Sequence, residues 1–104
     1  MKLKEIAYAR SGDKGPHVNI GVIAREAKDY PFLTIYLTKD RVSTYFAGLN
    51  PQEVIRYELP NLGALNFILE GVLDGGASLN LRVDAQGKGL AQILLEMEIS
   101  CHSS

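Results

Sequence analysis

Residues 3–24 read LKEIAYARSGDKGPHVNIGVIA, and this stretch decides the kind of fold that the chain adopts. Two short apolar runs, 3–9 and 20–24, flank a segment rich in glycine and charge. Because the runs are short and stop abruptly, they predict strands rather than helices. The strands would be joined by a loop of about ten residues, longer than the usual hairpin loop. Gly21, inside the second run, favours close approach of a backbone or a ligand.

The next part of the chain changes to helical and then back to strand periodicity. Residues 32–37 repeat their apolar side chains as one face of a helix requires. Thr38 is placed to cap a second helical segment that ends near Phe46. Residues 54–59 then predict a third strand, which Pro60 stops.

The last third of the chain gives weaker patterns. Residues 62–69 are apolar nearly all round and predict a short buried helix, and 79–83 alternate as a weak strand does. Asp84 is placed to cap a last helix with Leu90, Ile93 and Leu94 inward, and 95–99 suggest a closing strand. The order β-β-α-β-α-β-α-β predicts an α+β two-layer sandwich, with one sheet and helices on one face.

Composition limits the chain to one domain and excludes several classes of partner. The 104 residues, 46% hydrophobic and 22% charged, predict a single domain over residues 1–104. Eleven Lys and Arg stand against twelve Asp and Glu, which argues against nucleic acid or an anionic membrane as a partner. One cysteine, Cys101, cannot form an intrachain disulfide. With no apolar run near the ~20 residues that cross a bilayer, we expect a cytoplasmic protein.

The segment between the first two strands is the first candidate site. Its two glycines permit backbone conformations in which consecutive amides converge on an anion, and its cationic and hydroxyl side chains add donors. The candidate anion-binding residues are Arg10, Ser11, Gly12, Asp13, Lys14, Gly15 and Asn19. The spacing is neither a Walker loop nor a dinucleotide fingerprint. The alternative is a surface turn with a solvated pair of Asp13 and Lys14.

The predicted helix over 62–69 supplies the second candidate. Asn66 would be an amide in an apolar helix, Asn61 its cap, and Gly63 a place of close approach. Asn61, Gly63 and Asn66 are therefore candidates for an interface or a pocket. The alternative is that Asn66 bonds to a nearby loop. The sequence shows no metal-ligand spacing and no catalytic constellation, so we expect neither metal nor cofactor and assign no catalytic residue.

Four stretches, 9–15, 19–25, 56–67 and 84–88, resemble one family. They are similar to the small C-terminal domain of the acyclic terpene utilisation protein AtuA and its free-standing relatives. The resemblance implies a ferredoxin-like α+β domain, often encoded as a separate chain beside the large domain. It also implies a link to the breakdown of branched or terpenoid acyl-CoA compounds. It assigns no catalytic residue to the small domain.

Three functional hypotheses follow. The first is a non-catalytic partner subunit of an AtuA-like large protein, to which residues 10–19 contribute an acyl-CoA or carboxylate site. The second is a homo-oligomeric enzyme whose cleft forms between copies, with Lys14 or His17 as proton carrier. The third is a self-associating scaffold without a ligand. We expect the large protein as a partner and a homo-oligomer as the form of the chain.

Overall fold

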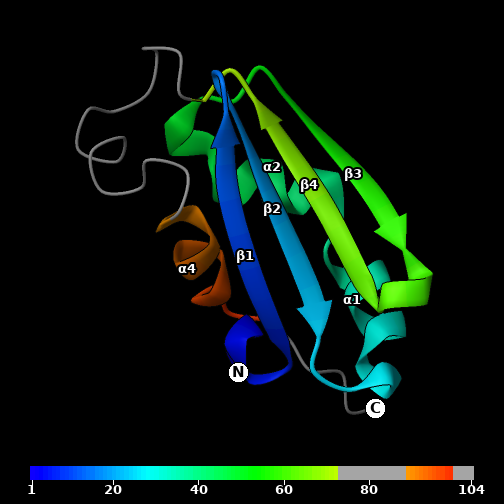
Figure 1. Ribbon diagram of the computed structural model, residues 1–104. Coiled ribbons are helices and arrows are strands. Elements are labelled where there is room, and N and C mark those ends of the chain that lie inside the picture. The colour runs from blue at the N-terminus through cyan, green and yellow to red at the C-terminus, as the bar shows by residue number, and fades with distance from the viewer. Residues whose placement is uncertain (73–88, 100–104) are drawn as a thin grey trace.

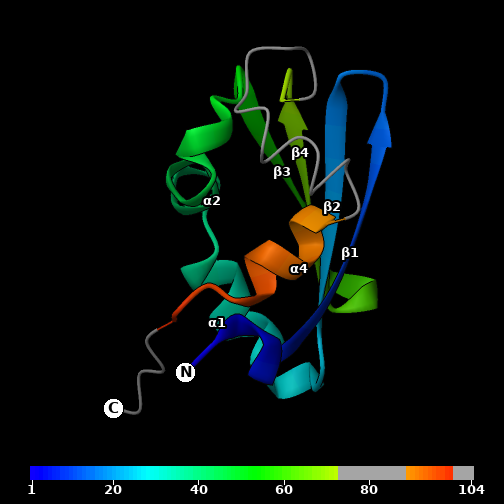
Figure 2. The ribbon, with the colours of Figure 1, turned by 90° about the vertical axis from the view of Figure 1, so that its left-hand side faces the viewer.

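Four antiparallel strands with helices on one face make up the described part of the computed structural model, residues 1–72 and 89–99 (Figures 1 and 2). The sheet order is β1-β2-β4-β3. The strands are β1 (Ala7–Lys14), β2 (His17–Ala24), β3 (Glu53–Leu59) and β4 (Ala64–Glu70). The helices are α1 (Tyr30–Tyr36), α2 (Lys39–Tyr45) and α4 (Gly89–Leu95). The 3-10 turns are η1 (Leu3–Glu5), η2 (Ala27–Asp29), η3 (Ala47–Leu49) and η4 (Pro60–Leu62).

The core lies between the sheet and the three helices, which Figure 2 shows on one side of the sheet. Side chains alternate along each strand, so every second residue faces this layer. The central strands supply Val18, Ile20, Val22, Leu65, Phe67 and Leu69, all fully buried. The helices supply Leu33, Val42, Leu90 and Leu94, also fully buried. The predicted α+β two-layer sandwich is confirmed.

The predicted ten-residue loop between the first two strands is wrong. β1 continues to Lys14 and β2 begins at His17, which leaves a turn of only two residues, Gly15 and Pro16. Gly15 has φ +62°, and a positive φ at the first central position is what a type II′ hairpin turn requires. The segment looked like a loop because it is polar. The segment belongs to β1, an edge strand with one face open to solvent. Side chains on a solvated face of an antiparallel sheet are commonly polar.

The predicted helix over 62–69 is also wrong, because this segment is the central strand β4. The strand pairs with β2 on one side and β3 on the other. It starts after Gly63, which has φ +60° and ends the η4 turn. The helices bury one face of β4, and its open face carries Ala64 and Ile68 beside Asn66, so the strand is apolar nearly all round. That pattern cannot distinguish it from a buried helix.

The remaining expectations have mixed outcomes. Both helices near Thr38 are confirmed, and the Thr38 hydroxyl accepts a hydrogen bond from the Arg41 amide at 3.1 Å as the cap of α2. The predicted last helix is confirmed as α4. The closing strand over 95–99 is reduced to one β-bridge, Lys2 with Glu98. The predicted strand over 79–83 and the cap at Asp84 lie outside the described residues.

The two ends of the described chain are held together by a small charge network. The Leu3 amide donates to the Met97 carbonyl at 2.9 Å. Beside it, Glu96 accepts from the ammonium groups of Lys2 at 2.7 Å and Lys4 at 2.9 Å. The hydrogen bonds from Lys2 and Lys4 lower the pKa of the Glu96 carboxyl. The bond between Lys2 and Glu96 also raises the pKa of the Lys2 ammonium.

These two shifts predict a pH window for the stabilisation that Glu96 provides. The pKa of Glu96 is lowered from 4.5. The contribution of its carboxylate to the free energy of unfolding is therefore present above pH 4.5 and is lost as the pH falls through the lowered value. The pKa of Lys2 is raised from 10.5, so the contribution is lost again as the pH rises through the raised value. We expect Glu96→Gln to lower the free energy of unfolding between these limits and to match the wild type at acid pH.

Urea denaturation of both proteins at a series of pH values measures this difference. Glu53→Gln is the matched control, because Glu53 is exposed and forms no ion pair with the residues that the structure describes. A constant difference between wild type and Glu96→Gln down to acid pH would contradict the expectation.

Candidate functional site

The sheet face turned away from the helices, here called the open face, is uncovered by any described element (Figures 1 and 2). Its side chains are the strand residues that alternate with the buried ones. From β1 to β3 they include Tyr8, Arg10, Gly12, Asn19, Gly21, Ile23, Asn66, Ile68, Ile55, Tyr57 and Leu59. The face therefore mixes apolar side chains with a few polar ones.

The sheet register brings Arg10 and Asn66 onto one line across the open face. Arg10 pairs with Gly21, Gly21 pairs with Asn66, and Asn66 pairs with Tyr57. Strands lie about 4.8 Å apart, so the Cα atoms of Arg10 and Asn66 are about 10 Å apart with a glycine between them. Because Gly21 has no side chain, this line has a gap at its centre.

That gap is part of a shallow pocket of about 400 Å³, here called the Arg10 pocket. It is lined by Arg10, Ser11, Gly12, Asn19, Gly21, Ile23 and Asn66. A Cβ atom at Gly21 would meet Asn66 Oδ1 at 3.7 Å, an ordinary contact distance, and one at Gly12 would meet nothing within 4 Å. The close approach expected at Gly21 is thus the Asn66 side chain, and the two glycines form the floor of the pocket.

Exposed apolar side chains lie on the same face as the Arg10 pocket, on its own line and on the next line of the register. On the strands, Tyr8 is 52% exposed, Tyr57 48% and Leu59 39%. The guanidinium of Arg25 lies over the Tyr8 ring at 4.0 Å, which adds a second cation to this end of the face. Large apolar side chains gathered on one exposed face mark the contact surface of many proteins.

The structure brings together five of the predicted site residues and separates the others. Arg10, Ser11, Gly12, Asn19 and Asn66 line the same pocket, although they were predicted as two unrelated sites. The amides of residues 12–15 do not form an anion cup, because 12–14 are strand residues whose successive amides point in opposite directions. The hydroxyl of Ser11 turns to the helical layer and accepts from the Ala91 amide at 3.1 Å.

The other predicted residues lie away from the Arg10 pocket. Asp13 and Lys14 are the last residues of β1, and Gly15 is in the hairpin turn. Asn61 and Gly63 line a different pocket of about 300 Å³ together with Tyr30. Asn66 is on a strand rather than in a helix, so its side chain points across the open face.

Sequence reasoning missed Tyr8 and Tyr57 as site residues. An aromatic side chain at strand spacing is expected to be core packing by default, and nothing in the sequence sets these two apart. The pairing register of the strands is what places these two tyrosines beside the Arg10 pocket. Tyr57 lies opposite Asn66, and Tyr8 is two positions from Arg10 on the same face.

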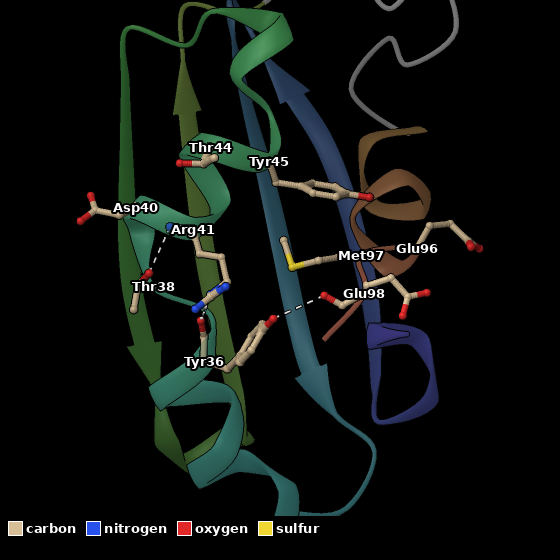
Figure 3. Close-up of a pocket in the computed structure, with 9 residues that line it drawn as sticks. All are labelled: Tyr36, Thr38, Asp40, Arg41, Thr44, Tyr45, Glu96, Met97 and Glu98. Carbon is tan, nitrogen blue, oxygen red and sulfur yellow. Dashed lines mark hydrogen bonds between the residues drawn. The ribbon is translucent and has the colours of Figure 1, made fainter. Parts of the chain in front are cut away.

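A larger groove of about 710 Å³ lies between α2 and residues 96–98 (Figure 3). Its polar groups are largely engaged with the chain itself. The Arg41 guanidinium stacks on the Tyr36 ring at 4.0 Å, and its Nε donates to the Tyr36 carbonyl at 2.9 Å. The Tyr45 hydroxyl donates to the Ile93 carbonyl at 2.6 Å, and partial burial raises the pKa of this phenol. These interactions join α2 to α1 and to α4, so these polar groups hold the helices together.

The described residues offer neither a cluster of metal ligands nor a helix that could span a membrane. Among the described residues, no group of three His, Cys, Asp or Glu side chains is placed to hold a metal ion. None of the helices in this part of the chain combines the length and the apolar character that passage through a bilayer requires.

The fold and the open face define a small α+β domain of the ferredoxin-like class, with a sheet face available for contact. A family model for the AtuA ferredoxin-like domain matches residues 1–100, and the chain belongs to this family. The resemblance noted in the sequence is thus confirmed. Searches of the curated proteins and of the solved structures find no match to the chain.

Proposed function

We propose that this chain is a non-catalytic partner subunit of an AtuA-like large protein in branched or terpenoid acyl-CoA catabolism, and that it docks through the open face. The observation that carries the proposal is the exposed apolar surface of Tyr8, Tyr57 and Leu59 on the same face as the Arg10 pocket. Membership of the AtuA ferredoxin-like family supports the choice of partner.

The composition of the open face fits docking better than catalysis. General acid–base catalysis needs a proton carrier within reach of a cleft. The Nδ1 atom of His17 instead accepts a hydrogen bond from the Gly71 amide at 3.2 Å, so that nitrogen is engaged. Aromatic and arginine side chains, by contrast, are the residues that dominate protein–protein binding energies.

Co-expression with an AtuA-like large protein tests the proposal. We expect the two chains to co-elute at a fixed ratio in size-exclusion chromatography. Tyr57→Ala should weaken the complex by about tenfold or more, because an interfacial tyrosine contributes more than 1.4 kcal/mol when it is a hot spot.

The matched control for Tyr57 is Ile35, which is 77% exposed on α1 in the helical layer. Ile35→Ala should leave the complex intact, since that side chain lies away from the open face. If the two chains elute separately, or if Ile35→Ala weakens the complex as much as Tyr57→Ala does, the proposal fails. If the isolated chain forms a dimer that Tyr57→Ala dissociates, the open face instead joins two copies of this chain.

A further inference from the structure

We infer, resting on the proposed function, that the Arg10 pocket receives a carboxylate of the docking partner. The carboxylate is an Asp or Glu side chain on the surface of the AtuA-like large protein. Arg10 would bind it with the fork of its guanidinium, and the carboxamide of Asn19 would provide a further donor.

Arg10 is the unengaged arginine among the four in the described part of the chain. The Nε of Arg25 donates to the Lys4 carbonyl at 3.0 Å, and Arg41 and Arg56 donate to carbonyls of α1 and its C-terminal end. Arg10 is exposed and makes no hydrogen bond or ion pair with the described residues. Its guanidinium is therefore available to a group outside the chain.

The space beside Arg10 fits a carboxylate. Gly21 lies between Arg10 and Asn66 in the register, and the pocket of about 400 Å³ that these residues line has room for a small planar group. An arginine presents parallel N–H donors that match the two oxygens of a carboxylate. Asn19 pairs with Gly12 on the neighbouring line, so its carboxamide borders the same gap.

The charged side chains near the Arg10 pocket also favour the binding of a negatively charged group. The acids of the open face, Glu53 and Glu70, pair with each other across β3 and β4, and no acid stands on the Arg10 line. Glu53 is four strand residues from Tyr57, a distance of about 13 Å. A second described cation, Arg25, lies over the Tyr8 ring. The charged side chain on the line of Gly21 is therefore the cation Arg10.

The shallow shape of the pocket favours a carboxylate on a protein over a free one. On an uncovered sheet face, an ion pair is solvated and holds a small anion only weakly. A partner surface that covers Tyr8, Tyr57 and Leu59 excludes water from the same pair and strengthens it. The pocket therefore works as one contact within a docking surface.

Affinity of the purified chain for the large protein, measured by calorimetry at two salt concentrations, tests this inference. We expect Arg10→Met to weaken binding by about thirtyfold, and Arg10→Glu to weaken it more, because the carboxylate loses its partner inside the interface. Arg10→Lys should recover part of the loss, since it restores the charge without the fork. The salt dependence of binding should be smaller for Arg10→Met than for the wild type.

Lys39→Met is the matched control, because Lys39 is an exposed cation on α2 in the helical layer. It should bind as the wild type does. If Arg10→Met binds normally while Tyr57→Ala binds weakly, docking stands and the carboxylate site is overturned. If the wild type does not bind the large protein, both proposals fall.

Sodium acetate separates the two sources of a carboxylate. We expect millimolar acetate to leave the thermal midpoint of the isolated chain unchanged. A rise in that midpoint that Arg10→Met abolishes would show a site for a free carboxylate and would overturn the assignment to the partner. Near-identical circular dichroism and midpoints of all Arg10 variants without ligand show that the fold is retained.

Discussion

Replacing Phe67 by alanine should lower the free energy of unfolding by about 3–5 kcal/mol, the usual cost of removing a buried aromatic side chain. Phe67 is fully buried on the central strand β4 and is the largest fully buried side chain in the described residues. It faces the helical layer between two paired neighbours, so the backbone cannot move to fill the cavity. Small domains are stable by only about 5–15 kcal/mol, so this single change brings the protein near unfolding.

Ile68→Ala is the control, because Ile68 is the next residue on β4 and lies on the open face. It is only partly buried, so its truncation should cost about 1 kcal/mol. Urea denaturation of the two variants compares the faces of one strand directly. Equal losses would mean that the open face is covered in solution, for example by a second copy of the chain.

Replacing Arg56 by methionine should cost about 2–3 kcal/mol, because it removes charged hydrogen bonds to backbone groups. The side chain of Arg56 is 16% exposed and reaches from β3 to the end of α1. Its Nη1 atom donates to the carbonyls of Thr34 and Leu37, both at 2.8 Å. The carbonyls at the C-terminal end of a helix have no intrahelical partner and carry partial negative charge. Methionine keeps the apolar stem but leaves these carbonyls without a donor.

Glu58→Gln separates this effect from the surface ion pair of the same arginine. Glu58 accepts from Arg56 Nη2 at 2.5 Å, but its side chain is 56% exposed. An exposed pair contributes less than about 1 kcal/mol, so the variant should be nearly as stable as the wild type. Thermal and urea unfolding of both variants measure the two costs. If Glu58→Gln costs as much as Arg56→Met, the carbonyl bonds are not the main contribution.

Part of the proposed site was already visible in the sequence, although for a different structural reason. Arg10 and Asn19 were selected as donors in a loop, and Asn66 as an amide in a helix. All three are strand residues, and the polar character that marked them reflects an uncovered sheet face. The tyrosines of the site could not be recognised, since a single sequence does not reveal which face of a strand the helices cover.

What the sequence determined by itself is local: the spacing that forms α1 and α2, the Thr38 cap, the strand at β3, and the family motifs. Each of these depends on neighbours a few residues apart along the chain. What only the tertiary structure decided is that β4 lies between β2 and β3, and that Arg10, Gly21 and Asn66 form one line. Strand pairing joins residues 11 and 45 positions apart on that line, and its register is set by which side chains the helices bury.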